Sequence, residues 1–114
     1  MESIGGNHII SDEVIATIAL SAAQEVKGIN TPGSFADKLG KRQSIKGIKV
    51  EQQEEGLKLE VKAVVDYGLN IPQVCNEFRE KVIEKLGNLT GLDVLAVDIH
   101  VTGINIHTDH IQET

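Results

Sequence analysis

The side chains best suited to chemistry lie near the C-terminus, and the chemistry that they suggest is metal binding. Asp98 and His100 are two residues apart, so on a strand both would point to the same face. His107, Asp109 and His110 follow in the C-terminal segment and are residue types that ligate zinc. Because no cysteine and no fixed ligand spacing accompany them, a solvated polar strand face is the favoured interpretation. We predict no metal site and no cofactor.

A second group of functional candidates is basic and lies between residues 30 and 46. Its cations, the predicted partner-binding residues, are Lys38, Lys41, Arg42 and Lys46. Long connections in small domains are usually either functional or flexible. Two interpretations therefore stay open for this basic loop. It is either a solvated, partly mobile connection or a contact surface for an acidic partner or anionic lipid head groups.

The sequence contains no recognisable catalytic arrangement. No serine lies in a G-x-S-x-G elbow, and no glycine-rich phosphate loop follows a strand. Cys75 falls on the apolar side of a predicted helix, which is typical of a small buried hydrophobe rather than a reactive thiol. We therefore predict a protein that is not an enzyme.

The alternative function is a KH-like nucleic-acid-binding regulator that uses the basic loop 38–46. The KH fold has a related order of elements, but its GXXG loop between two helices is absent here. The net charge of −6, from 17 acidic and 11 basic side chains, also argues against this function. No nucleic-acid partner is expected.

Length and composition limit the remaining possibilities. A chain of 114 residues suits one domain. Its single cysteine excludes an internal disulfide and fits a reducing compartment. No signal peptide is evident, and no apolar run approaches the ~20 residues of a membrane span. The expected location is cytoplasmic, with any membrane association made through a partner or a surface.

The stretch from residue 57 to 86 predicts a long strand followed by a helix. The predicted strand alternates, with one apolar row made of Leu57, Leu59, Val61, Ala63, Val65 and Tyr67. After Gly68 the apolar residues recur every three or four positions, as on the buried side of a helix. Asn70 is placed to cap this helix, which is predicted to run to about Thr90 and to end at Gly91.

Three further elements are predicted around this unit. Ser11 caps a first helix that ends at Gly28, with an apolar stripe of Val14, Ile15, Ile18, Ala19, Ala22 and Val26. A short strand over 48–51 joins the long strand through a hairpin at 53–56. A last strand spans residues 93–102. In it Leu95, Val97, Ile99 and Val101 face one way, and Val94, Ala96, Asp98, His100 and Thr102 face the other.

Together these elements predict an α+β fold in the order α-β-β-α-β. The fold is a two-layer sandwich in which a three-stranded sheet carries both helices on one face. The predicted single domain covers residues 11–104, with a flexible N-terminus over 1–10 and a flexible tail over 105–114. The opposite sheet face would be mostly polar, and the two sheet edges would be free to template another chain.

Several segments together resemble one protein family. They are Ser-Asp-Glu-Val-Ile at 11–15, Gly-Lys-Arg at 40–42, Lys-Gly-Ile-Lys-Val at 46–50, Asp-Tyr-Gly-Leu-Asn-Ile-Pro at 66–72, Thr-Gly-Leu at 90–92 and Val-Asp-Ile-His-Val at 97–101. As a set they resemble the alkaline shock protein family of Gram-positive bacteria, also called the envelope stress response family. Asp98 is a small departure, since the family often has Asn there.

The resemblance implies a cytosolic, non-enzymatic, self-associating protein linked to cell-envelope stress. Some members are tethered to the membrane by a small membrane-anchored partner, and others are encoded beside fatty-acid synthesis genes. The segment with Phe35, Leu39 and Gly40-Lys41-Arg42 resembles the branch associated with acetyl-CoA carboxylase genes. The expected partners are therefore a second copy of the chain, a small membrane-anchored protein or lipid-synthesis proteins. The expected function is a scaffold in envelope stress or lipid homeostasis, peripheral at the membrane through a partner.

Overall fold

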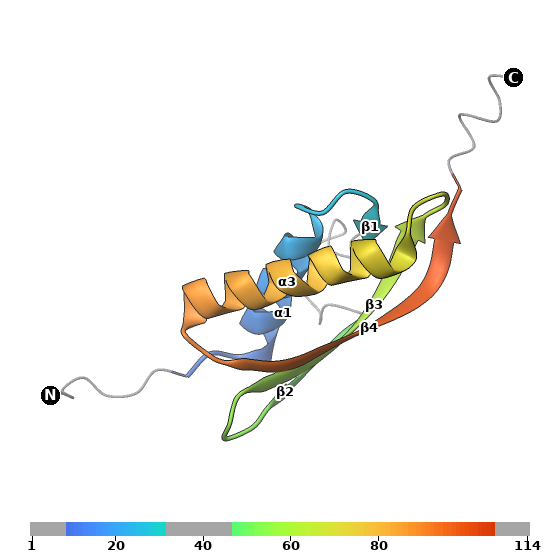
Figure 1. The fold of residues 1–114 in the computed structure, drawn as a ribbon. Coiled ribbons are helices and arrows are strands. Elements are labelled where there is room, and N and C mark those ends of the chain that lie inside the picture. Colours follow the sequence, from blue (N-terminus) through green and yellow to red (C-terminus); the bar gives the residue numbers. More distant parts are fainter. Residues whose placement is uncertain (1–8, 32–46, 107–114) are drawn as a thin grey trace, which may run out of the picture.

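The computed structural model describes residues 9–31 and 47–106, and it has two helices on one side of a four-stranded sheet (Figure 1). In chain order the elements are α1 (Asp12–Ala23), β1 (Ile29–Asn30), β2 (Ile48–Gln52), β3 (Leu57–Asp66), α3 (Ile71–Thr90) and β4 (Val94–Asn105). The α+β class and the two helices are as predicted. The number of strands differs.

The long strand β3 is the centre of the sheet. On one edge β4 pairs with it in parallel along its whole length, from Leu57 to Asp66. On the other edge β2 pairs antiparallel with residues 57–61, and β1 pairs antiparallel with Val64 and Val65. The sheet therefore has four strands but is only three strands wide.

The strand β1 corrects the predicted three-stranded order. Residues 29 and 30 are too few to show any alternation, and only Ile29 is buried. The strand forms because Gly28, at φ 92°, turns the chain after α1, and its carbonyl accepts a hydrogen bond from the Asp66 amide of β3. This strand is defined by its pairing with a distant strand rather than by a local sequence pattern.

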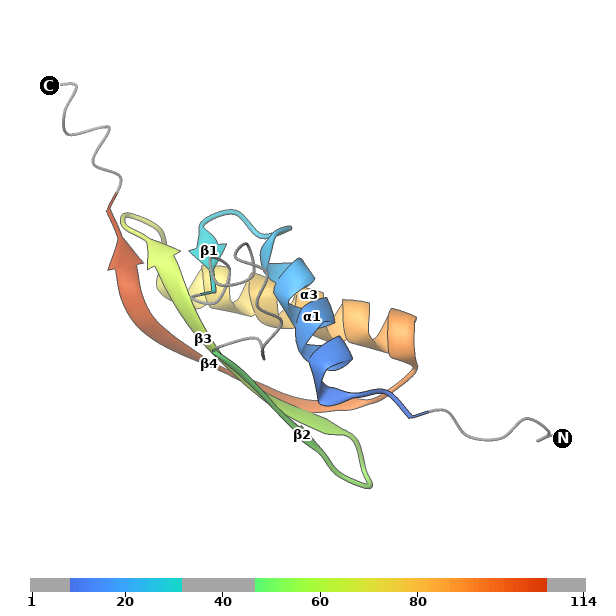
Figure 2. The same ribbon diagram turned by 180° about the vertical axis from the view of Figure 1, so that it is seen from behind.

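The hydrophobic core lies between the two helices and one face of β3, as the two views show (Figures 1 and 2). Alternate β3 residues from Leu57 to Val65 are fully buried, as the period predicted. The helices supply Ile15, Phe78, Val82 and Leu86, all with no exposed surface. Tyr67 does not continue the row. It lies beyond the end of the strand, and 72% of its surface is exposed.

The predicted helix caps are confirmed. The Ser11 side chain accepts a hydrogen bond from the Val14 amide, and the Asn70 side chain accepts one from the Gln73 amide. Gly91 ends α3 in the left-handed region at φ 76°. The first helix, however, is shorter than predicted, because after Ala23 the hydrogen bonds tighten to a three-residue spacing.

Two β-bulges on β4 change which side chains share a face. Leu57 pairs with Val94 and Lys58 with Ala96, so Leu95 is an extra residue in β4, and a second shift follows Val101. The predicted faces are therefore wrong at two positions. Val94 packs against the core, whereas Leu95 is 46% exposed. Val14 of α1 was likewise predicted in the apolar stripe but is exposed.

Most of the two terminal segments that were predicted to be flexible lies outside the described residues. At their borders, the Ile10 carbonyl accepts a hydrogen bond from the Gln52 side chain, and β4 runs to Asn105. The boundaries of the predicted single domain stay a prediction.

Candidate interaction surface

The residues predicted to bind a partner are not described by the structure. Lys38, Lys41, Arg42 and Lys46 lie between residues 32 and 46, and His107, Asp109 and His110 lie beyond residue 106. Asp98 and His100 are described and do share one face of β4, as predicted. Within residues 9–31 and 47–106, no group of three or more His, Cys, Asp or Glu is arranged to hold a metal ion.

Asp98 and His100 belong to a larger polar surface, the open face of the sheet, on the side away from the helices. We define it by Lys49 and Glu51 of β2, Lys58, Glu60 and Lys62 of β3, and Ala96, Asp98 and His100 of β4. All but Ala96 are exposed. The surface exists because the even-numbered residues of β3 point away from the core that their odd-numbered neighbours build.

Charges of both signs are mixed on this face, and they are of opposite sign between β2 and β3. Lys49 of β2 stands opposite Glu60 of β3, and Glu51 stands opposite Lys58. On the other side of β3, Glu60 neighbours Asp98. Three lysines and three carboxylates therefore occupy the face, which leaves it nearly neutral although the whole chain is acidic.

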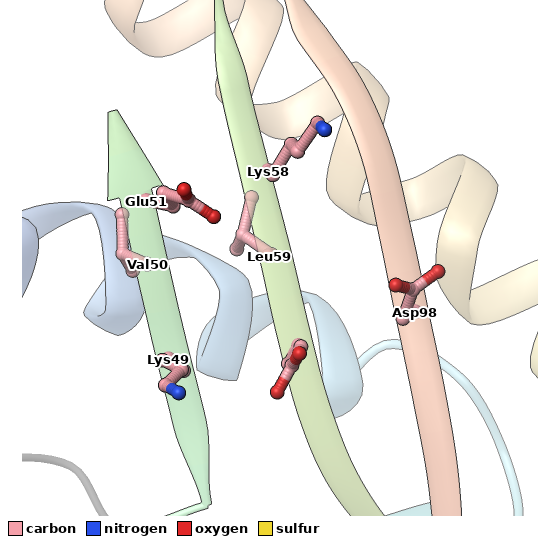
Figure 3. A pocket seen from close by; sticks show the side chains of 7 residues that line it. Lys49, Val50, Glu51, Lys58, Leu59 and Asp98 are labelled. Carbon is pink, nitrogen blue, oxygen red and sulfur yellow. The ribbon is translucent and has the colours of Figure 1, made fainter. Parts of the chain in front are cut away.

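The sheet is hollowed along this face. One hollow of about 310 Å³ lies over β2, β3 and β4, and Figure 3 shows side chains of all three strands around it. A second, of about 260 Å³, adjoins it and is lined in part by Lys62 and His100. Neither hollow is enclosed, so they suit contact with another surface better than enclosure of a small molecule.

The charged side chains of the open face form no ion pairs with one another in the part of the chain that the structure describes. The ion pairs found there are on the opposite layer, where Lys85 and Lys81 of α3 approach Glu25 just after α1. The hydrogen bond from Lys85 holds the pKa of the Glu25 carboxyl below its ordinary value. The charges of the open face thus remain available to a partner.

Cys75 is confirmed as a buried side chain of α3. Burial raises the pKa of its thiol, and the positive charge of Arg79 opposes that effect only in part. A raised pKa keeps the sulfur protonated at neutral pH and therefore a weak nucleophile.

The outer edge of β4 is a second candidate surface. The sequence analysis predicted only that the sheet would have free edges. The Arg79 side chain donates a hydrogen bond to the Val97 carbonyl at 3.2 Å, so this carbonyl points away from β3. At the end of the same strand, Ile104 and Ile106 are exposed, and so is Tyr67. Sequence reasoning placed Tyr67 in the apolar row, although the turn at the adjacent Gly68 could have indicated its exposure.

Comparison with known proteins identifies relatives over nearly the whole chain. The model of the alkaline shock protein 23 family, described as having a cell envelope-related function, matches residues 1–106. The uncharacterized protein YqhY of Bacillus subtilis is 36% identical over 104 residues, which cover 87% of this chain and 77% of that protein. The uncharacterized protein YloU of the same organism is 31% identical, over 85% of this chain and 87% of that protein.

Two further observations bear on the function. No solved structure matches the chain significantly. In the part of the chain that the structure describes, neither helix has the length and apolar character needed to cross a membrane.

Proposed function

Because the chain belongs to the alkaline shock protein 23 family, whose function is cell envelope-related, we propose that it is a non-enzymatic interaction protein of the envelope stress response. It acts through contacts with other proteins and with copies of itself. The observation that carries this proposal is the open face, a broad surface of exposed charges that form no ion pairs with one another in the described chain.

The charge pattern favours a protein partner over the other classes. A surface for anionic lipids or nucleic acid carries an excess of positive charge, whereas this face carries as many carboxylates as lysines. Mixed charges select a partner whose own charges lie in complementary positions, and they reject others by like-charge repulsion. The face therefore suits one specific protein surface.

The proposed partners are a small membrane-anchored protein, lipid-synthesis proteins and a second copy of this chain. A membrane-anchored partner would place the protein at the cytoplasmic side of the membrane without any insertion of its own helices. Self-association would then multiply each weak contact through multivalency.

Affinity purification from a Gram-positive host that contains this protein tests the partner contact. Tagged protein with Lys58→Glu is compared with tagged Lys27→Glu, which makes the same charge change on an exposed lysine away from the open face. We expect the first variant to lose envelope proteins that the wild type and the control retain. Equal recovery by both variants would contradict a role for the open face.

Sedimentation equilibrium of the pure protein tests self-association. We expect the mean mass to rise with concentration in the micromolar range. A mass that stays at the 12.3 kDa of one chain up to several hundred micromolar would contradict it.

A further inference from the structure

The backbone of β4 exposes hydrogen-bonding groups along its outer edge. The amide of Leu57, at the start of β3, and that of Tyr67, just after its end, donate to residues of the β4 segment, while the amide of Lys62 donates toward the β2 side. The backbone N–H and C=O groups of the odd-numbered residues of β3 therefore point toward β4. In a parallel ladder such residues bond to the two residues that flank their pairing partner. These are the even-numbered β4 residues, so the N–H and C=O groups of Val97, Ile99 and Val101 point outward.

This outward stretch is short and bounded. The bulge at Leu95 precedes it, and the register shift between Val101 and Gly103 follows it. Only Ala96–Val101 keeps the strict alternation that a further strand needs for pairing. Among the described residues, the one hydrogen bond found to an outward backbone group of this stretch is the bond from Arg79 to the Val97 carbonyl. A carbonyl oxygen has two lone pairs, so the Arg79 bond leaves room for a second donor.

The side chains on this stretch are complementary to themselves. An antiparallel partner strand must pair outward residues with outward residues. If Ile99 pairs with Ile99 of a second copy, Val97 pairs with Val101, and the whole pairing lies between the two bulges. The same register places Asp98 of each copy opposite His100 of the other, on the open face. Imidazole and carboxylate are hydrogen-bonding partners, and the pair occurs twice.

The neighbouring registers lack these properties. Shifting the two-fold axis toward the N-terminus places Asp98 opposite Asp98, which is repulsive. It also brings the bulged Leu95 into the pairing. Shifting it toward the C-terminus places His100 opposite His100 and brings in Gly103 beyond the second bulge. One register therefore combines unbroken pairing with favourable cross-strand contacts.

The helix beside this edge supports the same partner. Arg79 reaches the β4 edge, and Ile83 lies one turn later on that side of α3. Ile83 is 41% exposed although it is a large apolar residue. In a two-fold arrangement the two sheets become one, and both α3 helices lie on the same side of it. Each Ile83 would then face the other copy instead of water.

From these observations we infer that the outer edge of β4 binds the same edge of a second copy, antiparallel and with Ile99 on the two-fold axis. The inference rests on the proposed self-association and specifies its interface. The occupant is a copy of this chain because the pairing rule, the positions of the bulges and the Asp98–His100 complementarity all meet at one symmetric register.

Exchange of the facing side chains tests the inference in the full-length protein. The His100→Asp variant places two carboxylates opposite each other at both symmetric positions. We expect its dimer dissociation constant to rise about tenfold, given the usual energy of cross-strand charge pairs. The double variant Asp98→His with His100→Asp restores the original pairs in reverse and should return to within about twofold of the wild type. Failure of the double variant to recover would overturn the inference.

Disulfide trapping tests the register itself in a Cys75→Ala background. Asp98→Cys protein mixed with His100→Cys protein should form an intermolecular disulfide, whereas either protein alone should form much less. Fast cross-linking of Asp98→Cys alone, or of His100→Cys alone, would indicate a neighbouring register and overturn ours. Both positions are exposed, so far-UV circular dichroism should show unchanged folding.

The results separate the two proposals. If the wild type self-associates but these variants neither weaken nor trap it, the β4 interface is wrong and the proposed function stands. If the wild type is a strict monomer, self-association and the β4 interface are both wrong. The partner contact of the open face is then judged by the Lys58→Glu purification alone.

Discussion

The two faces of β3 show how one strand serves two purposes. Its odd-numbered residues from 57 to 65 are fully buried beneath α1 and α3, and its even-numbered neighbours Lys58, Glu60 and Lys62 are exposed. Burying one large aliphatic side chain contributes roughly 1.5–3 kcal/mol, whereas exposed charges contribute little to stability. The comparison shows that in one strand the buried side chains supply stability, while the alternate exposed side chains are available for contact with partners.

The largest expected effect comes from emptying the covered face. The Phe78→Ala change removes the largest fully buried side chain and should reduce the free energy of unfolding by about 3–5 kcal/mol. The control Lys62→Ala on the open face should change it by less than about 0.5 kcal/mol. Urea unfolding followed by circular dichroism measures both. Similar losses for the two variants would break the comparison.

A second effect comes from the hairpin that leads into β3. Gly56 has φ 155°, and a Cβ there would lie 2.5 Å from the Asp93 carbonyl oxygen, which is backbone and cannot easily move. The Gly56→Ala variant should lose about 2–4 kcal/mol of unfolding free energy. In Gly68→Ala, φ is also positive but the space is open, so the loss should be about 1 kcal/mol. Thermal unfolding ranks the two, and a reversed order would contradict the steric argument.

A smaller effect is expected at the start of α3. The Asn70→Ala change removes the acceptor for the Gln73 amide and should cost about 1 kcal/mol. The matched control Asn88→Ala, on the exposed side of the same helix, should be neutral or slightly stabilising because alanine is the better helix former. Chemical unfolding measures both variants. Equal losses would contradict the cap.

The smallest effect concerns pH. Because the pKa of Glu25 is lowered in the folded state, its contribution to stability is present above the ordinary value of 4.5. It is lost as the pH falls through the folded value. The Glu25→Gln variant should therefore show a melting temperature that falls less between pH 5 and pH 3 than that of the wild type. The control Glu55→Gln, in the hairpin loop, should follow the wild type. A parallel fall in all three proteins would contradict the role of Lys85.

The main elements could be predicted because their signals are local. The alternation of β3, the stripe of α3 and the caps at Ser11 and Asn70 depend on neighbours a few residues away. The strand β1 and the bulge at Leu95 could not be predicted, because both are set by pairing with β3 and leave no periodic pattern. The end of α1 at Ala23 was missed since nothing breaks the helix before Gly28.

The candidate surface was predicted only in its parts. Alternation alone identified the polar residues of each strand, including Asp98 and His100. Their arrangement required the pairing partners, because the direction and register of β4 against β3 decide that Glu60 meets Asp98. The basic residues 38–46, which the sequence singled out, were not described, so their role stays a prediction.

The extra residue Leu95 has a consequence for how this chain can change in length. Shortening the strand by that one amino acid would still leave Val94 against Leu57 and Ala96 against Lys58, so neither layer would be inverted. A chain that lacks this one residue would therefore keep its inner and outer side chains on the same faces. Removing one between Ala96 and Val101 would instead reverse the faces of the residues that follow, as far as the second bulge.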